Sequence, residues 1–191
     1  MISKRFCTAF VICVGTAFGP AVAQDQVIPR RVEQPIDWQA VQQAIQTDQS
    51  RDSNAINLFR SSVPAGVDSV NVPVLVPGTG PVRASPRFRG QNNAYAAAYL
   101  LNAAKLTILG SSIALALPAD DSLAASMQAI GDSTEPQFEI LEDGTDLSFS
   151  RFGASYTLRI SCSAPDDERC TKDEFLRSVA RSLVTIGGKP Q

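Results

Sequence analysis

The segment from Ala154 to Cys162 limits the possible folds of this chain more strongly than any other part of the sequence. Apolar and polar residues alternate through it, which is the period-two pattern of a strand with one buried and one solvated face. Such a strand needs neighbouring strands and a second layer over its apolar face. The pattern therefore predicts a sheet that is covered on one side, with inward positions at Tyr156, Leu158, Ile160 and Cys162.

A helix with an apolar stripe is predicted after this strand. The stretch Thr171-Lys172-Asp173-Glu174 has the spacing of a capping box, so Thr171 and Glu174 are expected to close the start of the helix. Gly187-Gly188 is expected to end it. The buried stripe is predicted at Phe175, Leu176, Val179, Ala180 and Leu183.

Cys162 and Cys170 are the only cysteines beyond residue 23, and this even number indicates a disulfide. The alternatives are a redox pair or a metal site. Thioredoxin-type motifs, however, space their cysteines by two residues, and two thiols alone make a poor zinc site. Closing so short a loop would stabilise the fold by about 2–3 kcal/mol and would tie the C-terminal helix to the strand.

Strand signals also occur earlier in the chain. Valines alternate with other residues between Val70 and Val76, and Pro73 indicates an edge strand there. Apolar runs over 94–117 indicate a strand meander, although the alanine-rich piece 94–106 has helix propensity as well. Asp143-Gly144 marks a tight hairpin turn. Residues 77–90 are rich in proline and glycine, and we expect a long loop over them.

Helix signals lie mainly outside these strands. Asp37 can cap a helix whose apolar face carries Trp38, Val41 and Ile45, and a second helix is expected over 123–130. Together the patterns predict an α+β fold. It consists of an antiparallel sheet of meandering strands with helices packed on one face and a C-terminal helix tied by the disulfide.

The first 23 residues have the three zones of a signal peptide. Lys4 and Arg5 precede an apolar run over 6–18, and Ala21-Val22-Ala23 is a small-x-small site that predicts cleavage between Ala23 and Gln24. As a helix the run would rise about 20 Å, short of a hydrocarbon core of about 30 Å, which argues against an uncleaved anchor. We expect a signal peptide over 1–23, a mobile arm over 24–36, and one globular domain over 37–191.

The compartment and charge narrow the classes of function. Loss of Lys4 and Arg5 would take the net charge from −2 to −4, which argues against a nucleic-acid binder. No later stretch has the length and apolar character of a membrane span, so an integral membrane protein is not expected. The compact leader and the absence of Asn-x-Ser/Thr after it favour the bacterial periplasm.

The chain has no histidine, and this absence excludes several kinds of site. Ser-His-Asp and Cys-His catalysis are excluded, as are most zinc, copper and haem sites. No lysine follows a serine at the Ser-x-x-Lys spacing, and no Walker P-loop is present. We therefore expect no catalytic residues, no metal and no cofactor.

Arg83, Arg87 and Arg89 cluster around Phe88 in the proline- and glycine-rich stretch. Guanidinium groups bind carboxylates and phosphates through paired hydrogen bonds, so these four residues are the candidate binding site for an anionic glycan, a lipid headgroup or an acidic protein. The alternative is a surface loop whose arginines keep it soluble and whose Phe88 fills the edge of the core.

Carboxylates are the remaining candidates for catalysis. Glu139, Glu142, Asp143 and Asp146 lie close together around one hairpin, and glycoside cleavage needs two carboxyl groups about 5 to 9.5 Å apart. The simpler interpretation places Glu139 on a solvent face and Asp143 in the turn. No acidic stretch has the spacing of a calcium loop.

The C-terminal third, with RFGASYTLRISC, Cys170 and FLRSVARSLVTIGG, resembles a segment of small exported proteins of Gram-negative bacteria. The resemblance covers strand, disulfide, helix and double glycine, and it implies a periplasmic location but no activity. The preferred hypothesis is a non-enzymatic periplasmic binding or accessory protein that contacts an envelope protein or anionic envelope component. The alternatives are a carboxylate-only enzyme acting on cell-wall glycan and a structural subunit of an envelope complex.

Overall fold

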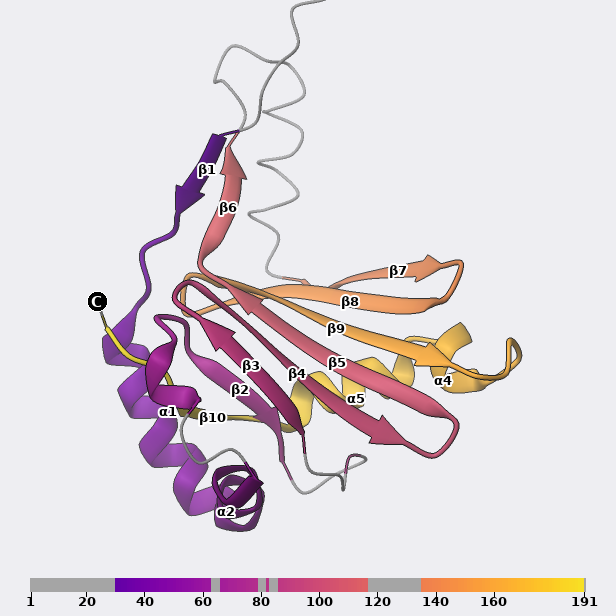
Figure 1. The fold of residues 1–191 in the computed structure, drawn as a ribbon, viewed down its shortest axis with the longest axis horizontal. Coiled ribbons are helices and arrows are strands. Elements are labelled where there is room, and N and C mark those ends of the chain that lie inside the picture. Colours follow the sequence, from indigo (N-terminus) through magenta and orange to yellow (C-terminus); the bar gives the residue numbers. More distant parts are fainter. Residues whose placement is uncertain (1–29, 63–65, 79–81, 83–85, 117–134, 191) are drawn as a thin grey trace, which may run out of the picture.

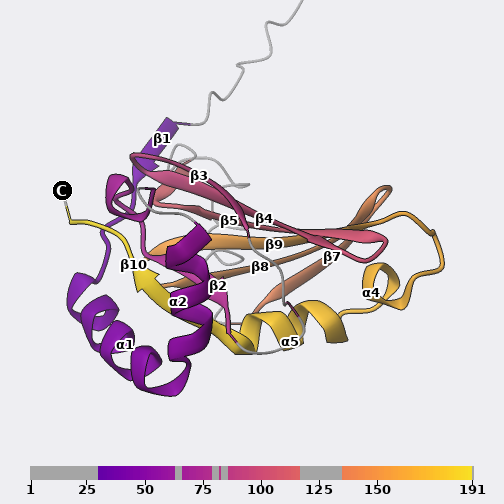
Figure 2. The same ribbon diagram turned by 60° about the horizontal axis from the view of Figure 1, so that its bottom comes forward.

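The computed structural model describes residues 30–62, 66–78, 82, 86–116 and 135–190. These residues form an antiparallel six-stranded sheet with helices and a two-stranded ribbon against one of its faces, as Figure 1 and Figure 2 show. The predicted α+β class is confirmed. In order across the sheet, the strands are β3 (Arg87–Gln91), β4 (Ala94–Leu101), β5 (Ala104–Ser111), β9 (Ala154–Cys162), β8 (Gly144–Arg151) and β7 (Gln137–Leu141).

The second layer lies under the sheet in Figure 2. It contains the helices α1 (Trp38–Arg51), α2 (Ser53–Ser62) and α5 (Glu174–Ser182). It also contains an antiparallel ribbon of β2 (Val74–Pro77) and β10 (Leu183–Gly187). The core lies between this layer and the inner face of the sheet.

The alternation of apolar and polar residues in the sequence determines which side of each strand faces the core. In β9, Ala154, Tyr156, Leu158 and Ile160 are buried while the residues between them are partly or fully exposed. The alanine-rich segment 94–101 is a strand, with Tyr95, Ala97 and Tyr99 buried. Its helix propensity is overridden because only the extended form places both tyrosines on the core face while pairing with β3 and β5.

β2 is an edge strand, as Pro73 indicated, because it pairs only with β10 among the described strands; unlike a strand with alternating apolar and polar faces, it is buried on both faces. Val74, Leu75 and Val76 are all at most 1% exposed, so the segment is a continuous apolar strand between the sheet and the helices. Side chains bind the free edge of β2. The hydroxyl of Tyr95 accepts from Leu75 N at 2.9 Å and donates to Leu75 O at 3.2 Å, and Tyr156 donates to Pro73 O.

The free edge of β10 is bound by helix α1. Asp48 is buried, and its carboxylate accepts from Thr185 N at 2.7 Å. Arg51, one turn later, pairs with Asp48 at 3.0 Å and donates to Leu183 O at 3.1 Å. The two side chains thus supply the acceptor and the donor that a further strand would have supplied.

The predicted loop over 77–90 is wrong at its C-terminal end, where Arg87–Gln91 forms β3 at the sheet edge. The physical reason is the alternation of Arg87, Phe88 and Arg89, in which the arginines are exposed and the ring faces the core. Phe88 contacts Phe59 edge-on and Tyr95 in a stacked arrangement, each with ring centroids 5.6 Å apart. The burial of this ring outweighs the turn preference of the surrounding prolines and glycines.

The C-terminal helix is shorter than predicted and has a different start. Thr171 ends a separate short helix, α4 (Glu168–Thr171), and its hydroxyl donates to Asp167 O instead of capping α5. Asp173 occupies the N-cap position of α5 and pairs with Arg177. The helix ends at Ser182, because the β-branched residues that follow continue as β10 and pair with β2.

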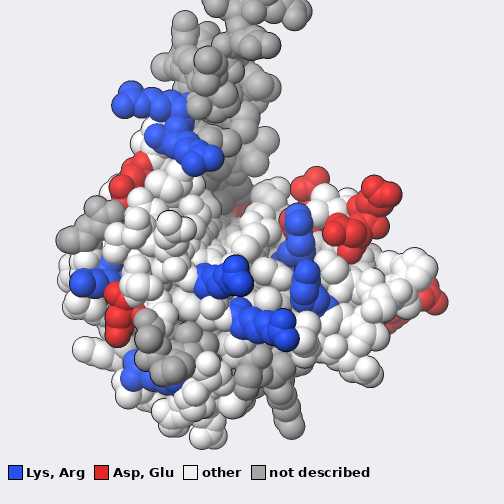
Figure 3. All heavy atoms as spheres, viewed as in Figure 1, with Lys and Arg blue, Asp and Glu red and all other residues white. Residues whose placement is uncertain are grey.

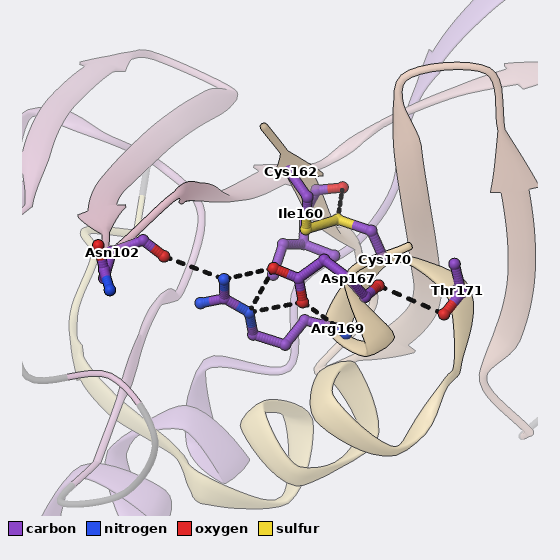
Figure 4. The surroundings of a disulfide bond; sticks show 7 residues. All are labelled: Asn102, Ile160, Cys162, Asp167, Arg169, Cys170 and Thr171. Atoms are coloured by element: carbon purple, nitrogen blue, oxygen red, sulfur yellow. Dashed lines mark hydrogen bonds and ion pairs between the residues drawn. A yellow bond between two sulfur atoms is a disulfide. The ribbon is translucent and has the colours of Figure 1, made fainter. Parts of the chain in front are cut away.

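The disulfide between Cys162 and Cys170 is present, with a Cα–Cα distance of 6.1 Å. It joins the end of β9 to α4, the short helix before α5 (Figure 4). Arg169 adds a second link, because its guanidinium pairs with Asp167 and donates to Asn102 O at 2.9 Å. Both bonds hold α4 against the turn-bearing end of the sheet.

The hairpin predicted at Asp143-Gly144 joins β7 and β8, but its turn lies one residue earlier. Glu142 and Asp143 form the turn, and Gly144 already pairs with Leu141. A side chain at Gly144 would meet the carbonyl oxygen of Ile160, so the close approach of β9 requires glycine there.

The mobile arm was predicted over residues 24–36, of which residues 24–29 lie outside the described part of the chain. Arg30–Glu33 forms β1, which pairs antiparallel with β6 (Ile113–Ala116) and extends away from the sheet (Figure 1). All four β1 residues are exposed, and no helix or sheet of the described residues packs over the ribbon. Asp37 caps α1 as predicted, accepting from Ala40 N at 3.0 Å.

Three predictions fall outside the described residues: the signal peptide with its Ala23–Gln24 cleavage site, the helix over 123–130, and the position of Arg83. Within the described residues, no helix combines the length and the apolar character needed to span a bilayer.

Candidate functional site

No helix or strand of the described residues covers the face of the six-stranded sheet opposite the helices, and this uncovered face is toward the viewer in Figure 1. Small side chains occupy most outward positions of the central strands, and two exposed leucines, Leu100 and Leu109, lie among them. A wide, open hollow at the β3 edge is lined in part by Arg87, Arg89, Ala96 and Leu109. The small side chains are Ala94, Ala96 and Ala98 on β4, Thr107 and Ser111 on β5, Ser155 and Thr157 on β9, and Ser148 and Ser150 on β8.

Four cationic side chains project from this face. Arg87 and Arg89 come from β3, Lys105 from β5 and Arg159 from β9. The strand register places Arg87, Ala98, Thr107 and Arg159 opposite one another in one row across the sheet. With strands about 4.8 Å apart, the backbones of Arg87 and Arg159 are about 14 Å apart. Figure 3 shows the blue groups over the middle of the sheet.

Only one of the four cations is held by an acid. Arg159 makes a two-pronged ion pair with Asp146, with Nε–Oδ1 and Nη2–Oδ2 distances of 2.7 Å. These hydrogen bonds and the carboxylate charge raise the pKa of Arg159 above its ordinary value. Arg87, Arg89 and Lys105 are exposed and have no ion-pair or hydrogen-bond partner for their side chains among the described residues. Their donors are therefore available to a ligand.

Acidic residues occupy the opposite end of the same face. The row through Arg159 continues to Asp146 and Glu139, while Glu142 and Asp143 form the β7–β8 turn. Glu139, Glu142 and Asp143 are exposed, and none of the four acids lines the four main pockets of the described residues. One carboxylate of this group is thus ion-paired and the other three lie in solvent.

The structure divides the predicted binding residues. Arg87 and Arg89 lie on the uncovered face, whereas Phe88 lies on the core face, so the ring does not flank the guanidinium groups as expected. Lys105 and Arg159 were not predicted as site residues. Both residues lie at outward positions of strands with a period-two pattern. That they lie on the same face as Arg87 and Arg89 becomes apparent only once the pairing of the strands is known.

A second group of arginines lines a pocket of about 270 Å³ between β8 and α5. Two of them already have partners within the protein. The guanidinium of Arg151 lies 4.9 Å from the ring centroid of Phe152, and Arg177 pairs with Asp173. Arg181 is the third. This group therefore offers less free charge than the uncovered sheet face.

A metal centre has no support in the described residues, which contain no group of three or more acidic or cysteine side chains suitable for binding a metal ion. The comparisons with known proteins add no further assignment. No protein-family model matches the chain, and neither a curated protein nor a solved structure is found to be similar to it.

Proposed function

We propose that this chain is an exported, periplasmic, non-enzymatic binding protein whose uncovered sheet face binds an anionic component of the cell envelope. One observation carries the proposal. Arg87, Arg89 and Lys105 are exposed, lie on the same face of one sheet and have no ion-pair partner among the described residues. A cluster of unpaired cations on a protein expected to be net acidic indicates an anionic ligand.

The chemistry of the face favours carboxylate or phosphate groups on an extended ligand. Arginine binds either group through two parallel hydrogen bonds, and lysine adds a compact point charge. The hollow that Arg87, Arg89 and Leu109 help to line is wide and open, so a polymer or a headgroup surface fits better than an enclosed small molecule. The acidic end at Glu139 and Asp143 would repel the same ligand and so limit how it lies across the face.

Export is supported by the sequence and by the disulfide. The leader over 1–23 has the zones of a signal peptide, and the Cys162–Cys170 bond is the kind of link that persists in an oxidising compartment. The resemblance of the C-terminal third to small exported proteins points to the same location.

The test measures binding of the protein without its leader to two anionic probes, immobilised polygalacturonate and vesicles containing phosphatidylglycerol. Dextran and phosphatidylcholine vesicles are the neutral counterparts. The triple variant Arg87→Ala/Arg89→Ala/Lys105→Ala should bind at least about tenfold more weakly, because each exposed contact contributes about 0.5–1 kcal/mol. The probe that is bound identifies the carboxylate or the phosphate source.

The matched control is Arg30→Ala/Arg31→Ala/Lys189→Ala, which removes the same charge from outside the sheet face. It should retain most of the binding. An equal loss in both triple variants would mean that net charge alone attracts the ligand, and no binding to either anionic probe would contradict the proposal. Binding should also weaken as salt is raised, because exposed charges are screened.

A further inference from the structure

The uncovered sheet face has two halves that differ in charge (Figure 3). The half formed by β3, β4 and β5, called here the β3–β5 half-face, carries Arg87, Arg89 and Lys105, and these three strands contain no acidic residue. The half formed by β9, β8 and β7 carries the acidic residues of the face, and its arginine is paired with Asp146. The cations of this face that have no ion-pair partner among the described residues therefore all lie on the β3–β5 half-face.

Two exposed leucines lie among these cations. Leu100 on β4 is 59% exposed and Leu109 on β5 is 40% exposed. The strand register places Leu100 directly opposite Lys105, and it places Leu109 in the row that begins with Arg89. Leu109 and Arg89 also line the same open hollow. A single exposed leucine is common on protein surfaces, but leucines interleaved with available cations indicate a partner that is both anionic and apolar.

A lipid bilayer fits this combination better than an acidic protein or a charged polysaccharide. All three aromatic residues of β3, β4 and β5 face the core, and alanine is the commonest outward residue of these strands, whereas protein interfaces are rich in aromatic residues and poor in alanine. A polysaccharide has no apolar phase that could accept the leucines. An anionic bilayer offers phosphate groups at its surface and hydrocarbon directly beneath them.

We propose, on the basis of the anion binding proposed above, that the β3–β5 half-face binds the surface of an anionic lipid bilayer. The three cations contact lipid phosphates, while Leu100 and Leu109 enter the apolar layer below. The aliphatic stems of arginine and lysine allow their charged ends to stay among the headgroups next to an inserted leucine. The same surface repels Glu139 and Asp143, so the sheet meets the bilayer with its β3 side and not with its β7 side.

The test measures co-sedimentation of the protein without its leader with phosphatidylglycerol vesicles and, separately, binding to immobilised polygalacturonate. The variant Leu100→Thr/Leu109→Thr keeps every cation, and threonine suits a strand. Its vesicle affinity should fall about tenfold, because the exposed parts of the two leucines together amount to roughly one leucine transferred into the bilayer. Any affinity for polygalacturonate should equal that of the wild-type protein.

The matched control is Val32→Thr/Ile140→Thr. Val32 and Ile140 are also strand residues, 37% and 64% exposed, and both lie outside the β3–β5 half-face. This variant should bind phosphatidylglycerol vesicles like the wild-type protein. An equal loss of vesicle binding in both double variants would show that any exposed apolar side chain promotes the association, and it would overturn the proposal.

The two probes separate bilayer binding from anion binding in general. If Arg87→Ala/Arg89→Ala/Lys105→Ala loses vesicle binding but Leu100→Thr/Leu109→Thr keeps it, the face binds anions without inserting side chains, and the bilayer proposal is wrong. Binding of the wild-type protein to polygalacturonate alone would also overturn it, in favour of a carboxylate-bearing polymer, and would leave the proposed anion binding intact. A wild-type protein that binds neither probe would contradict both.

Discussion

Tyr95 and Tyr99 lie four residues apart on the same face of β4, but their hydroxyl groups have opposite surroundings. The hydroxyl of Tyr95 binds both backbone groups of Leu75, while that of Tyr99 has no partner among the described residues. Tyr95→Phe should destabilise the fold by about 1–3 kcal/mol, because it leaves a buried N–H and C=O unpaired. Tyr99→Phe removes an unpaired group and should leave stability unchanged or raise it by about 1 kcal/mol.

Urea unfolding of the two variants measures this difference, and each variant serves as the packing control for the other. Both substitutions delete one oxygen and keep the ring, so the lost hydrophobic area is nearly the same. A loss of stability in Tyr99→Phe as large as that in Tyr95→Phe would show that Tyr99 has a partner in the free protein.

A second residue-scale prediction concerns Asp167. Hydrogen bonds from the Arg169 side chain and backbone lower the pKa of its carboxyl from 3.8 to about 2. The lowered pKa in the folded state means that the ionised form stabilises the protein above about pH 4. That contribution is lost as pH falls from about 4 towards 2.

NMR titration of the Asp167 side-chain carboxyl carbon gives the pKa directly. In Arg169→Gln the midpoint should move back towards 3.8, and Asp167→Asn should remove this part of the acid dependence of stability. A midpoint near 3.8 in the wild-type protein would contradict the ion pair between Asp167 and Arg169.

At the scale of elements, helix α1 contributes to the stability of the fold mainly by binding the backbone of β10. Asp48→Ala should cost about 2–4 kcal/mol, because Thr185 N loses its acceptor and Arg51 its carboxylate. Asp48→Asn keeps an acceptor oxygen for Thr185 N and should cost less. Thermal unfolding of both variants gives the comparison. If the asparagine variant is as unstable as the alanine variant, the charge rather than the hydrogen bond is what stabilises the contact.

The sequence predicted well those strands in which the pattern of apolar and polar residues depends on a single interface, that between the sheet and the core. Strand β9 and the two strands over 94–111 alternate because each strand has a core face and a solvent face. Strand β10 was mistaken for the end of a helix, because Leu183 continues the apolar stripe of α5 in sequence. Its extended form depends on pairing with β2, more than 100 residues earlier, and no local pattern contains that information.

The candidate site was also predictable only in part, because a local pattern in the sequence reveals some of its residues and strand pairing reveals the others. Arg87 and Arg89 stand out in the sequence because they cluster, and the structure places both on one face. Lys105 and Arg159 join them only through the register of β3, β4, β5 and β9. The sequence cannot predict that the Tyr99 hydroxyl lacks a hydrogen-bond partner among the described residues, because this depends on which polar groups surround it in the folded protein.

At the scale of the whole molecule, the β1–β6 ribbon and the two-layer body should differ in stability. Every residue of β1 is exposed, so the ribbon has little apolar burial to hold it closed. In the following segment, by contrast, Ile36 packs on the core and Asp37 N donates to Phe152 O at 3.0 Å. The amides of the ribbon should therefore exchange with solvent much faster than those of β5 and β9.

Two N-terminal truncations test where the stable body begins. Removal of residues 1–33 deletes β1 and should change the free energy of unfolding by less than about 1 kcal/mol. Removal of residues 1–37 also deletes the packing of Ile36 and the Asp37 cap of α1, and should cost about 1–3 kcal/mol more. If the shorter truncation already produced the full loss, β1 would be part of the stable body, and the ribbon would need a contact beyond its pairing with β6.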